Sequence, residues 1–228
     1  MKYLILPFLL LITFFTEAAT ISSKSSGGDW NSTSTWIGNN IPTAADDVII
    51  NGTVAGAGSC KSLTVSSGAT LLNRSGYGET IVINGDITNN GTIQNAASGS
   101  LYLNVYGRIT NNGTWNNRYI YLYQTGNAHL SQASGKYFEN LTLEAANGKA
   151  DSIVMQTDVM FKACNYTSKG TNKRVLVADQ TRLNIINCTV NSFNIQTNDT
   201  VDLNNSTITG CTIYGKGTIS GTVHIKSG

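Results

Sequence analysis

The sequence predicts an all-β protein whose chain coils into a parallel β-solenoid with about 22 residues per coil. Three observations lead to this fold class. The hexapeptide I-T-N-N-G-T occurs at 87–92 and again at 109–114, 22 residues later. The 228 residues include 23 Gly but only two Pro, together with abundant Asn, Thr and Ser, as in strands separated by tight turns. Short segments rich in Thr and aliphatic residues recur to the end of the chain, at 181–186, 200–203 and 218–225.

The repeated hexapeptide is the strongest of these signals. Each copy follows a segment in which apolar and polar residues alternate, 80–85 for the first and 101–107 for the second. A coil of fixed length stacks equivalent positions above one another, whereas a hairpin sheet gives no reason for this interval. We therefore expect the two Asn-Asn-Gly-Thr copies to form a turn ladder in which Asn bonds to its copy in the next coil. The copies lack the Asp pattern of calcium-binding turns, and the sequence predicts no metal and no cofactor.

The beginning of the chain predicts export. Residues 1–18 have the order of a secretory signal, with Lys2, an apolar stretch from Leu4 to Phe15 and small residues at the end. The apolar stretch is too short for a membrane-spanning helix, which needs about 20 residues. We expect cleavage after Ala18, a secreted or cell-surface location and no membrane insertion of the mature chain. The predicted domains are a signal at 1–18, an N-terminal cap and first coil at 19–60, and a solenoid at 61–228 that continues beyond the chain end in one interpretation.

The four cysteines, at 60, 164, 188 and 211, lie in a compartment that permits disulfides. Cys188 and Cys211 are 23 residues apart within similar segments, N-C-T-V and G-C-T-I, and Cys164 precedes Cys188 by 24 residues. This spacing predicts equivalent positions in adjacent coils, with Cys164 continuing the same inward column. A Cys188–Cys211 disulfide is compatible with the separation of neighbouring coils. A metal site is not indicated, because no close Cys or His pair is present.

The N-terminal region carries a family resemblance. Residues 28–36 are G-D-W-N-S-T-S-T-W, followed by P-T-A-A-D-D-V-I-I at 42–50 and C-K-S-L-T-V at 60–65. This order resembles the opening of secreted repeat proteins common in Bacteroidetes and is distantly similar to the eight-glycine domain of extracellular proteins. The resemblance covers Gly28 to about Leu71. It implies a right-handed parallel β-helix in a surface or adhesin-like protein, although the same modules occur in some polysaccharide-acting enzymes.

The residues themselves agree with a structural role for this region. Trp30 and Trp36 offer large apolar area to cover the open end of the first coil. Asp46 and Asp47 precede the first clear strand and can accept backbone N–H bonds in the turn before it. We assign all four to the cap, with a catalytic carboxylate pair as the alternative for the two aspartates.

Aromatic residues after the second hexapeptide form the candidate binding site. Alternation places Tyr119, Tyr121 and Tyr123 on one face, and Trp115 lies just before them. An exposed row of such rings could stack against sugars, whereas a buried or interface row is the competing interpretation.

Catalytic motifs are missing from the sequence. Carboxylates are dispersed, and the two histidines, His129 and His224, each stand alone. A β-helix lyase or hydrolase needs Asp clustered with Lys, Arg or His on one face. Charged residues are 12% of the chain, the net charge is +2, and no basic stripe indicates nucleic acid as a partner.

The sequence therefore predicts an extracellular structural or adhesive module that binds surface glycans, with a carbohydrate-active β-helix enzyme as the alternative. The partners expected are extracellular polysaccharide or another cell-surface protein. A third interpretation, an ice- or surface-binding solenoid, would need regular threonine ladders, and five threonines suggest them: Thr64, Thr88, Thr92, Thr110 and Thr114. The chain ends directly after a strand, which suggests end-to-end self-association or a longer natural chain.

Overall fold

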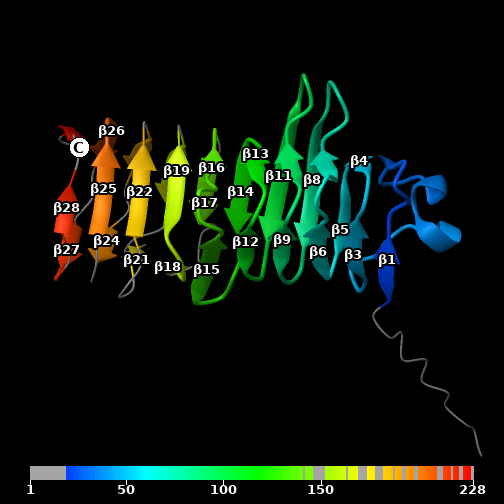
Figure 1. The fold of residues 1–228 in the computed structure, drawn as a ribbon, viewed down its shortest axis with the longest axis horizontal. Helices are drawn as coiled ribbons and strands as arrows, with labels where there is room; N and C mark the ends of the chain where they lie inside the picture. Colours follow the sequence, from blue (N-terminus) through cyan, green and yellow to red (C-terminus); the bar gives the residue numbers. More distant parts are fainter. Residues whose placement is uncertain are drawn as a thin grey trace, which may run out of the picture.

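The computed structural model describes residues 19–226 apart from several short gaps. The gaps are 141, 146–151, 163, 169–173, 178–181, 187, 192–193, 198–199, 210–212, 217 and 221–222. The described residues form an elongated parallel β-solenoid with its N-terminal and C-terminal coils at opposite ends (Figure 1). The predicted fold class is thus confirmed. The expected signal at 1–18 lies outside the described residues.

Three parallel sheets form the walls of the solenoid, and within its described part they contain ten, ten and nine strands. The first sheet comprises β1 (Thr20–Ser22), β3 (Asp47–Ile50), β6 (Ser62–Val65), β9 (Ile87–Asn89), β12 (Ile109–Asn111), β15 (Asn127–Gln132), β18 (Ser152–Met155), β21 (Arg174–Val177), β24 (Asn194–Thr197) and β27 (Ile213–Gly215). The second sheet comprises β2 (Gly28–Asp29), β4 (Thr53–Ala55), β7 (Thr70–Leu72), β10 (Thr92–Gln94), β13 (Thr114–Asn116), β16 (Phe138–Glu139), β19 (Val159–Lys162), β22 (Arg182–Ile186), β25 (Thr200–Asn204) and β28 (Thr218–Ser220). The third sheet comprises β5 (Gly58–Cys60), β8 (Gly78–Ile83), β11 (Ser100–Val105), β14 (Tyr119–Leu122), β17 (Thr142–Ala145), β20 (Asn165–Ser168), β23 (Thr189–Asn191), β26 (Ser206–Thr209) and β29 (Val223–Lys226).

The core lies between the three sheets and follows from alternation along each strand. Inward positions are apolar and stack in register from coil to coil, as in the column Ile81, Leu103, Ile120 and Leu143, each at most 1% exposed. Burying one such side chain stabilises the fold by roughly 1.5–3 kcal/mol. The residues between them point outward, so the outer surface is built from every second residue of each strand.

The length of the coil is not constant. The pairs aligned in adjacent coils are 15 residues apart for Asp47 and Ser62, 22 for Asn89 and Asn111, and 18 for Cys188 and Ser206. The strands keep their register because extra residues enter the corners. The connections before β8 and β11 are the clearest example, since they project from the body (Figure 1).

The repeated Asn-Asn-Gly-Thr segments form the predicted turn ladder. Asn89 and Asn111 are fully buried, and the Asn89 amide donates to Asn111 Oδ1 at 3.1 Å. The next residue in each copy is exposed, and Asn112 donates to Asn90 Oδ1 at 2.9 Å. Each buried Asn also accepts the N–H of the glycine two residues later, at 3.1 and 3.2 Å. A side chain on Gly113 would begin 2.1 Å from the carbonyl oxygen of Gly91, so the stacked corner requires glycine there.

The N-terminal segment closes one end of the solenoid (Figure 1). Between residues 19 and 60, β1 and β3 both join the first sheet and β2 and β4 both join the second. The segment therefore contains more of the solenoid than one coil. Two short 3-10 helices, Thr33–Thr35 and Ile37–Asn39, extend from it. Across the described ranges, none of the helices has the length and apolarity needed to span a membrane.

Candidate functional site

The four predicted cap residues lie where the solenoid begins. Trp30 and Trp36 are fully buried, their ring centroids are 5.2 Å apart in an edge-to-face arrangement, and Trp36 Nε1 donates to the Trp30 carbonyl at 2.8 Å. Asp46 accepts the backbone N–H and the hydroxyl of Thr43 at 2.8 and 2.7 Å. Asp47 accepts the Ser62 hydroxyl from the next coil. These contacts hold the turn before β3 and join it to the next coil.

The pKa values of both aspartates are lowered by these contacts. The hydroxyl of Thr43 is the main cause for Asp46, and the hydroxyl of Ser62 is the main cause for Asp47. A hydrogen bond to the charged form favours ionisation, which suits a carboxylate that holds a turn.

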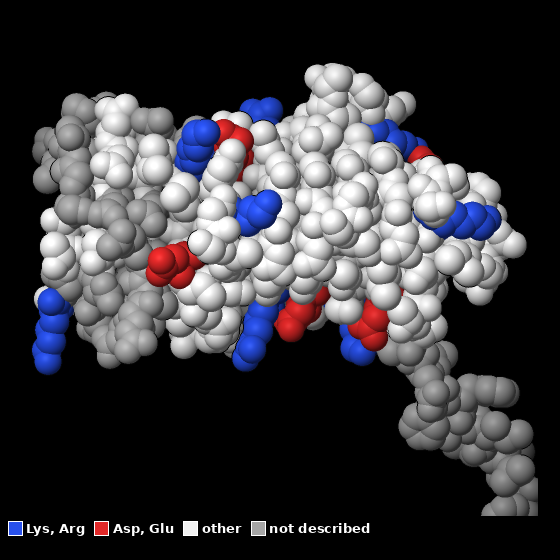
Figure 2. Space-filling model, in the orientation of Figure 1, with Lys and Arg blue, Asp and Glu red and all other residues white. Residues whose placement is uncertain are grey.

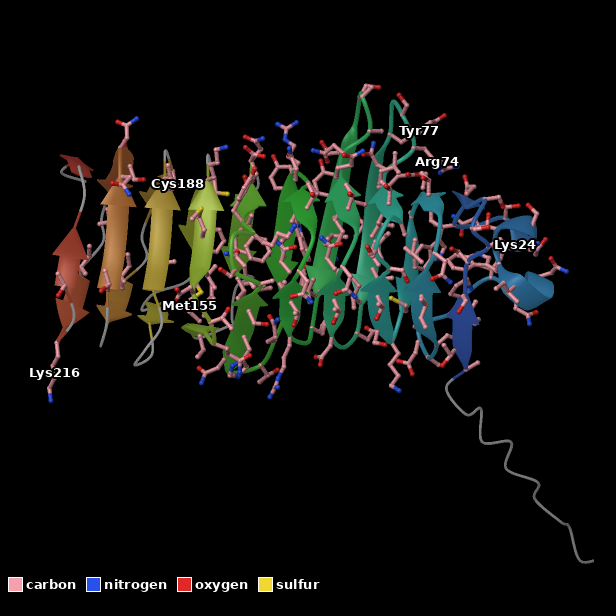
Figure 3. The ribbon with its side chains drawn as sticks, in the orientation of Figure 1. Lys24, Arg74, Tyr77, Met155, Cys188 and Lys216 are labelled. Atoms are coloured by element: carbon pink, nitrogen blue, oxygen red, sulfur yellow. The ribbon has the colours of Figure 1, made fainter. Side chains whose placement is uncertain are left out.

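The cysteine prediction is corrected in part. Cys164 and Cys188 do occupy one inward column, with the Cys164 N–H donating to Cys188 Sγ at 3.2 Å. The next member of that column is Ser206, because Thr189 aligns with Thr207 and the Cys188 N–H donates to Ser206 Oγ at 3.2 Å. The predicted equivalence of Cys188 and Cys211 is therefore wrong, since this coil is shorter than the spacing of the cysteines. Cys188 is a free buried thiol here (Figure 3), and Cys211 lies outside the described residues.

The three predicted tyrosines point outward on the third sheet. Tyr119, Tyr121 and Tyr123 alternate with buried Ile120 and Leu122 and are each partly exposed. Their neighbour Tyr102, on β11, aligns with Tyr119 and stacks on it with centroids 5.0 Å apart. Tyr106 stacks on Tyr123 in the same way, also at 5.0 Å.

The flat faces of these rings are largely occupied by the protein itself. Tyr119 has Tyr102 stacked on it, and the Arg118 guanidinium lies 5.4 Å from its ring centroid. Tyr102 in turn lies against Gly78 of the preceding coil, where a Cβ would meet the ring at 3.3 Å. A sugar stacks on an aromatic face, and here the faces contact one another. The arrangement favours a surface ladder of tyrosines that stack on one another over the sugar-binding row.

Trp115 does not belong to a binding face, which corrects the prediction. Its side chain is 1% exposed and packs against Phe138, with ring centroids 5.2 Å apart. The indole N–H donates to buried Asn117 at 2.7 Å. Trp115 aligns with inward Ile93 of the preceding coil, so alternation in β13 turns it into the core.

Charged side chains pair along the corners of the solenoid. Arg74 lies in the projecting loop before β8 (Figure 3) and contacts Asp29 at 3.1 Å and Glu79 at 2.5 Å. Lys61 contacts Asp47 at 3.2 Å, and the Asp86 carboxylate accepts the Arg108 N–H at 2.7 Å. In the part of the chain that the structure describes, no three His, Cys, Asp or Glu side chains gather as a metal site would require.

A different surface stands out between the paired charges, and we call it the threonine face. It is formed by outward residues of three successive coils, in one row on the first sheet, one along the corner and one on the second sheet. The nine residues are Thr64, Thr88 and Thr110, then Ser66, Asn90 and Asn112, then Thr70, Thr92 and Thr114. None is charged and none is buried. Figure 2 shows a broad uncharged area right of the centre of the body, with charged side chains above and below it.

Two of the three rows follow directly from strand register. Thr64 aligns with Thr88 and Thr88 with Thr110, while Thr70, Thr92 and Thr114 align in the same manner. Neighbouring strands are about 4.8 Å apart, so the hydroxyls repeat at that interval. The sequence analysis identified five of these threonines but not Thr70 or the corner row of Ser66, Asn90 and Asn112. Thr70 precedes Thr92 by the same 22 residues that separate Thr92 from Thr114, so the repeat interval could have placed it in this row.

Comparison of the chain with protein-family models, with curated proteins and with solved structures finds no match. Function must therefore be argued from the surface itself.

Proposed function

We propose that this protein is an extracellular structural and adhesive β-solenoid module that attaches to neutral glycans through the threonine face. The observation that supports this proposal is the register of nine uncharged hydroxyl and amide side chains over three coils. The fold supplies a rigid support, and the rows supply contacts at regular intervals.

Physical chemistry favours a neutral, hydroxyl-rich partner for this face. Hydroxyl and amide groups exchange hydrogen bonds with sugar hydroxyls, and no charge has to be stripped of water in the contact. Threonine is β-branched, so its side chain loses little rotational freedom when it binds. Each row offers methyl groups beside its hydroxyls, which suits the mixed apolar and polar surface of a polysaccharide chain.

The structural part of the proposal depends on the internal ladders. The buried Asn89–Asn111 pair, the stacked tyrosines and the Cys164–Cys188–Ser206 column each tie one coil to the next. Contacts of this kind repeat along the axis, so the solenoid resists bending between coils.

The experiment is a depletion assay with the chain that begins at Ala19. The chain is mixed with insoluble neutral polysaccharides and, separately, with insoluble acidic ones, and the protein left in solution is measured together with released reducing ends. We expect saturable retention on at least one neutral polymer, no retention by heat-unfolded chain and no release of sugar. Failure to bind any neutral polymer would contradict the adhesive role, and sustained release of sugar would establish the enzyme alternative.

Ice binding is a second candidate, and the same register favours it. Threonine rows on two neighbouring sheets present hydroxyl and methyl groups at a fixed repeat. An ice-growth assay separates the two functions, because an ice-binding face halts crystal growth in the absence of any polysaccharide. Unchanged crystal growth would remove this candidate.

A further inference from the structure

The corner between the first and second sheets opens into a hollow of about 400 Å³ next to β15 and β19. Its lining includes Gln132, Lys136, Thr157, Asp158 and Met160. A smaller hollow of about 230 Å³ lies on the other side of the same loop and is lined by Thr114, Lys136 and Tyr137. Since Thr114 belongs to the threonine face, the two hollows continue that face toward the C-terminal end.

The hollows exist because the corner is longer in this coil. In the two preceding coils the corner consists of an Asn-Gly pair, 90–91 and 112–113, packed backbone against backbone. Between β15 and β16 the corner is 133–137, which includes a turn in which the Lys136 N–H donates to the Ala133 carbonyl at 3.1 Å. The longer loop cannot pack against its neighbours as closely, and space remains on both of its sides.

Gln132 lines the larger hollow and carries a buried hydrogen-bond acceptor. It continues the column of Asn89 and Asn111, since Asn111 aligns with Gln132, and it is only 8% exposed. Its amide nitrogen donates to the Lys136 carbonyl at 2.5 Å. Its Oε1 atom is buried and has no hydrogen-bond partner in the described structure.

The missing partner has a clear structural origin. The equivalent oxygens of Asn89 and Asn111 accept the N–H of Gly91 and Gly113. The longer corner after Gln132 has Ser134 two residues later, and its backbone N–H does not donate to Gln132 Oε1. A buried acceptor without a partner is unfavourable, and a donor that reached it from the hollow would remove that cost.

We propose that the larger hollow binds one unit of a neutral pyranose sugar, with a sugar hydroxyl donating to Gln132 Oε1. This inference rests on the proposed function and names the place where a single sugar is held. A volume of about 400 Å³ is in the range of small-molecule sites and admits one ring. Lys136 supplies a donor at its rim, and the negative charge of Asp158, which also lines the hollow, disfavours an acidic sugar.

The aromatic residue beside the loop fits the same ligand. Tyr137 is 37% exposed and lines the smaller hollow. The Lys162 ammonium lies 5.0 Å from its ring centroid and also contacts Glu139 at 3.3 Å. A sugar chain leaving the larger hollow toward Thr114 would pass this ring.

The test uses soluble neutral sugars, glucose, galactose and mannose with their β-linked disaccharides, and NMR titration of the chain from Ala19. We expect saturable binding in the millimolar range for at least one of them. Gln132→Leu should weaken it about tenfold or more. Gln124→Leu is the matched control. Gln124 is buried to a similar degree, at 6% exposed, and its Oε1 also has no partner, but it lies at another corner, where its amide donates to the Gly107 carbonyl.

Each outcome bears on the proposal. If Gln132→Leu fails to fold, Lys136→Ala removes the rim donor instead and should weaken binding with the melting temperature unchanged. The inference is overturned if no soluble sugar binds, or if Gln132→Leu folds and binds as the wild type does. Retention on insoluble polymer in the depletion assay would then still support the threonine face, so the two proposals fail separately.

Discussion

The side-chain amide of Asn89 donates to Oδ1 of Asn111, one coil further along the chain, and neither side chain is exposed to solvent. The bond joins two coils through groups that water cannot reach. Asn112 and Asn90 make a bond of similar length on the outside of the same corner. The two pairs allow burial to be tested with the hydrogen-bond type held constant.

Asn111→Ala should lower the free energy of unfolding by about 2–3 kcal/mol, because the Gly113 N–H and the Asn89 amide lose their buried acceptor. Asn112→Ala should cost about 0.5 kcal/mol, since water replaces the exposed bond. Urea unfolding followed by circular dichroism measures both. Equal losses of unfolding free energy in the two variants would mean that the buried Asn89–Asn111 bond contributes no more to stability than the exposed one.

Tyr119→Ser should lower the free energy of unfolding by about 1–2 kcal/mol through loss of ring contacts with Tyr102 and Arg118. Retention on neutral polysaccharide should stay at the wild-type level, because the proposed binding surface is the threonine face and these rings stack on one another. Tyr77→Ser is the control, since Tyr77 is 60% exposed in the projecting loop (Figure 3), and it should change stability by about 0.5 kcal/mol or less. Loss of polysaccharide binding in a folded Tyr119 variant would indicate that the tyrosines of the third sheet, and not the threonine face, form the binding site.

Acid should destabilise the N-terminal coils through Asp46 and Asp47. Their pKa values are lowered from 3.8 in the folded chain, so their contribution to stability is complete above that pH and is lost as the pH falls through the lowered pKa. Thermal unfolding between pH 5 and pH 2 should show a falling midpoint, with pH values chosen to bracket that window. Asp46→Asn cannot titrate and should flatten the profile, and an unchanged slope would show that Asp46 does not contribute.

The cysteines should differ in their reaction with iodoacetamide. Burial raises the pKa of Cys60 to about 12, with the charge of Asp47 as a smaller cause, whereas hydrogen bonds from Cys164 lower the pKa of Cys188. Alkylation of the native chain at alkaline pH should therefore modify Cys188 before Cys60, with the order disappearing in denaturant. Peptide mapping without reduction checks the order, and the same map would reveal a Cys188–Cys211 disulfide if one forms.

The sequence was informative where coil length was constant and misleading where it changed. The 22-residue offset correctly stacked Asn89 on Asn111, and the same offset relates Ile93 to Trp115. That second relation could have revealed Trp115 as a core residue. The cysteine prediction failed because 18 residues, not 23, separate Cys188 from its neighbour Ser206.

Surface features that depend on corner length were beyond sequence reasoning. Alternation correctly turned Tyr119, Tyr121 and Tyr123 outward, but which ring covers which depends on the register of β11 and β14. The hollow at Gln132 depends on the loop 133–137, whose path no periodicity specifies. The alternation of apolar and polar residues predicts which side chains of a strand point outward, whereas a cavity forms where a corner loop departs from the repeat.

Retention on the neutral polysaccharide bound by the wild type decides whether the threonine face is the adhesive surface. The variant Thr88→Lys/Thr92→Lys places two bulky charges on the face, and Thr207→Lys places one on an outward, partly exposed threonine of the third sheet. We expect the double variant to lose about tenfold or more in affinity, with its melting temperature preserved, and Thr207→Lys to bind as the wild type does. Undiminished binding by the folded double variant would contradict the threonine face as the site of attachment.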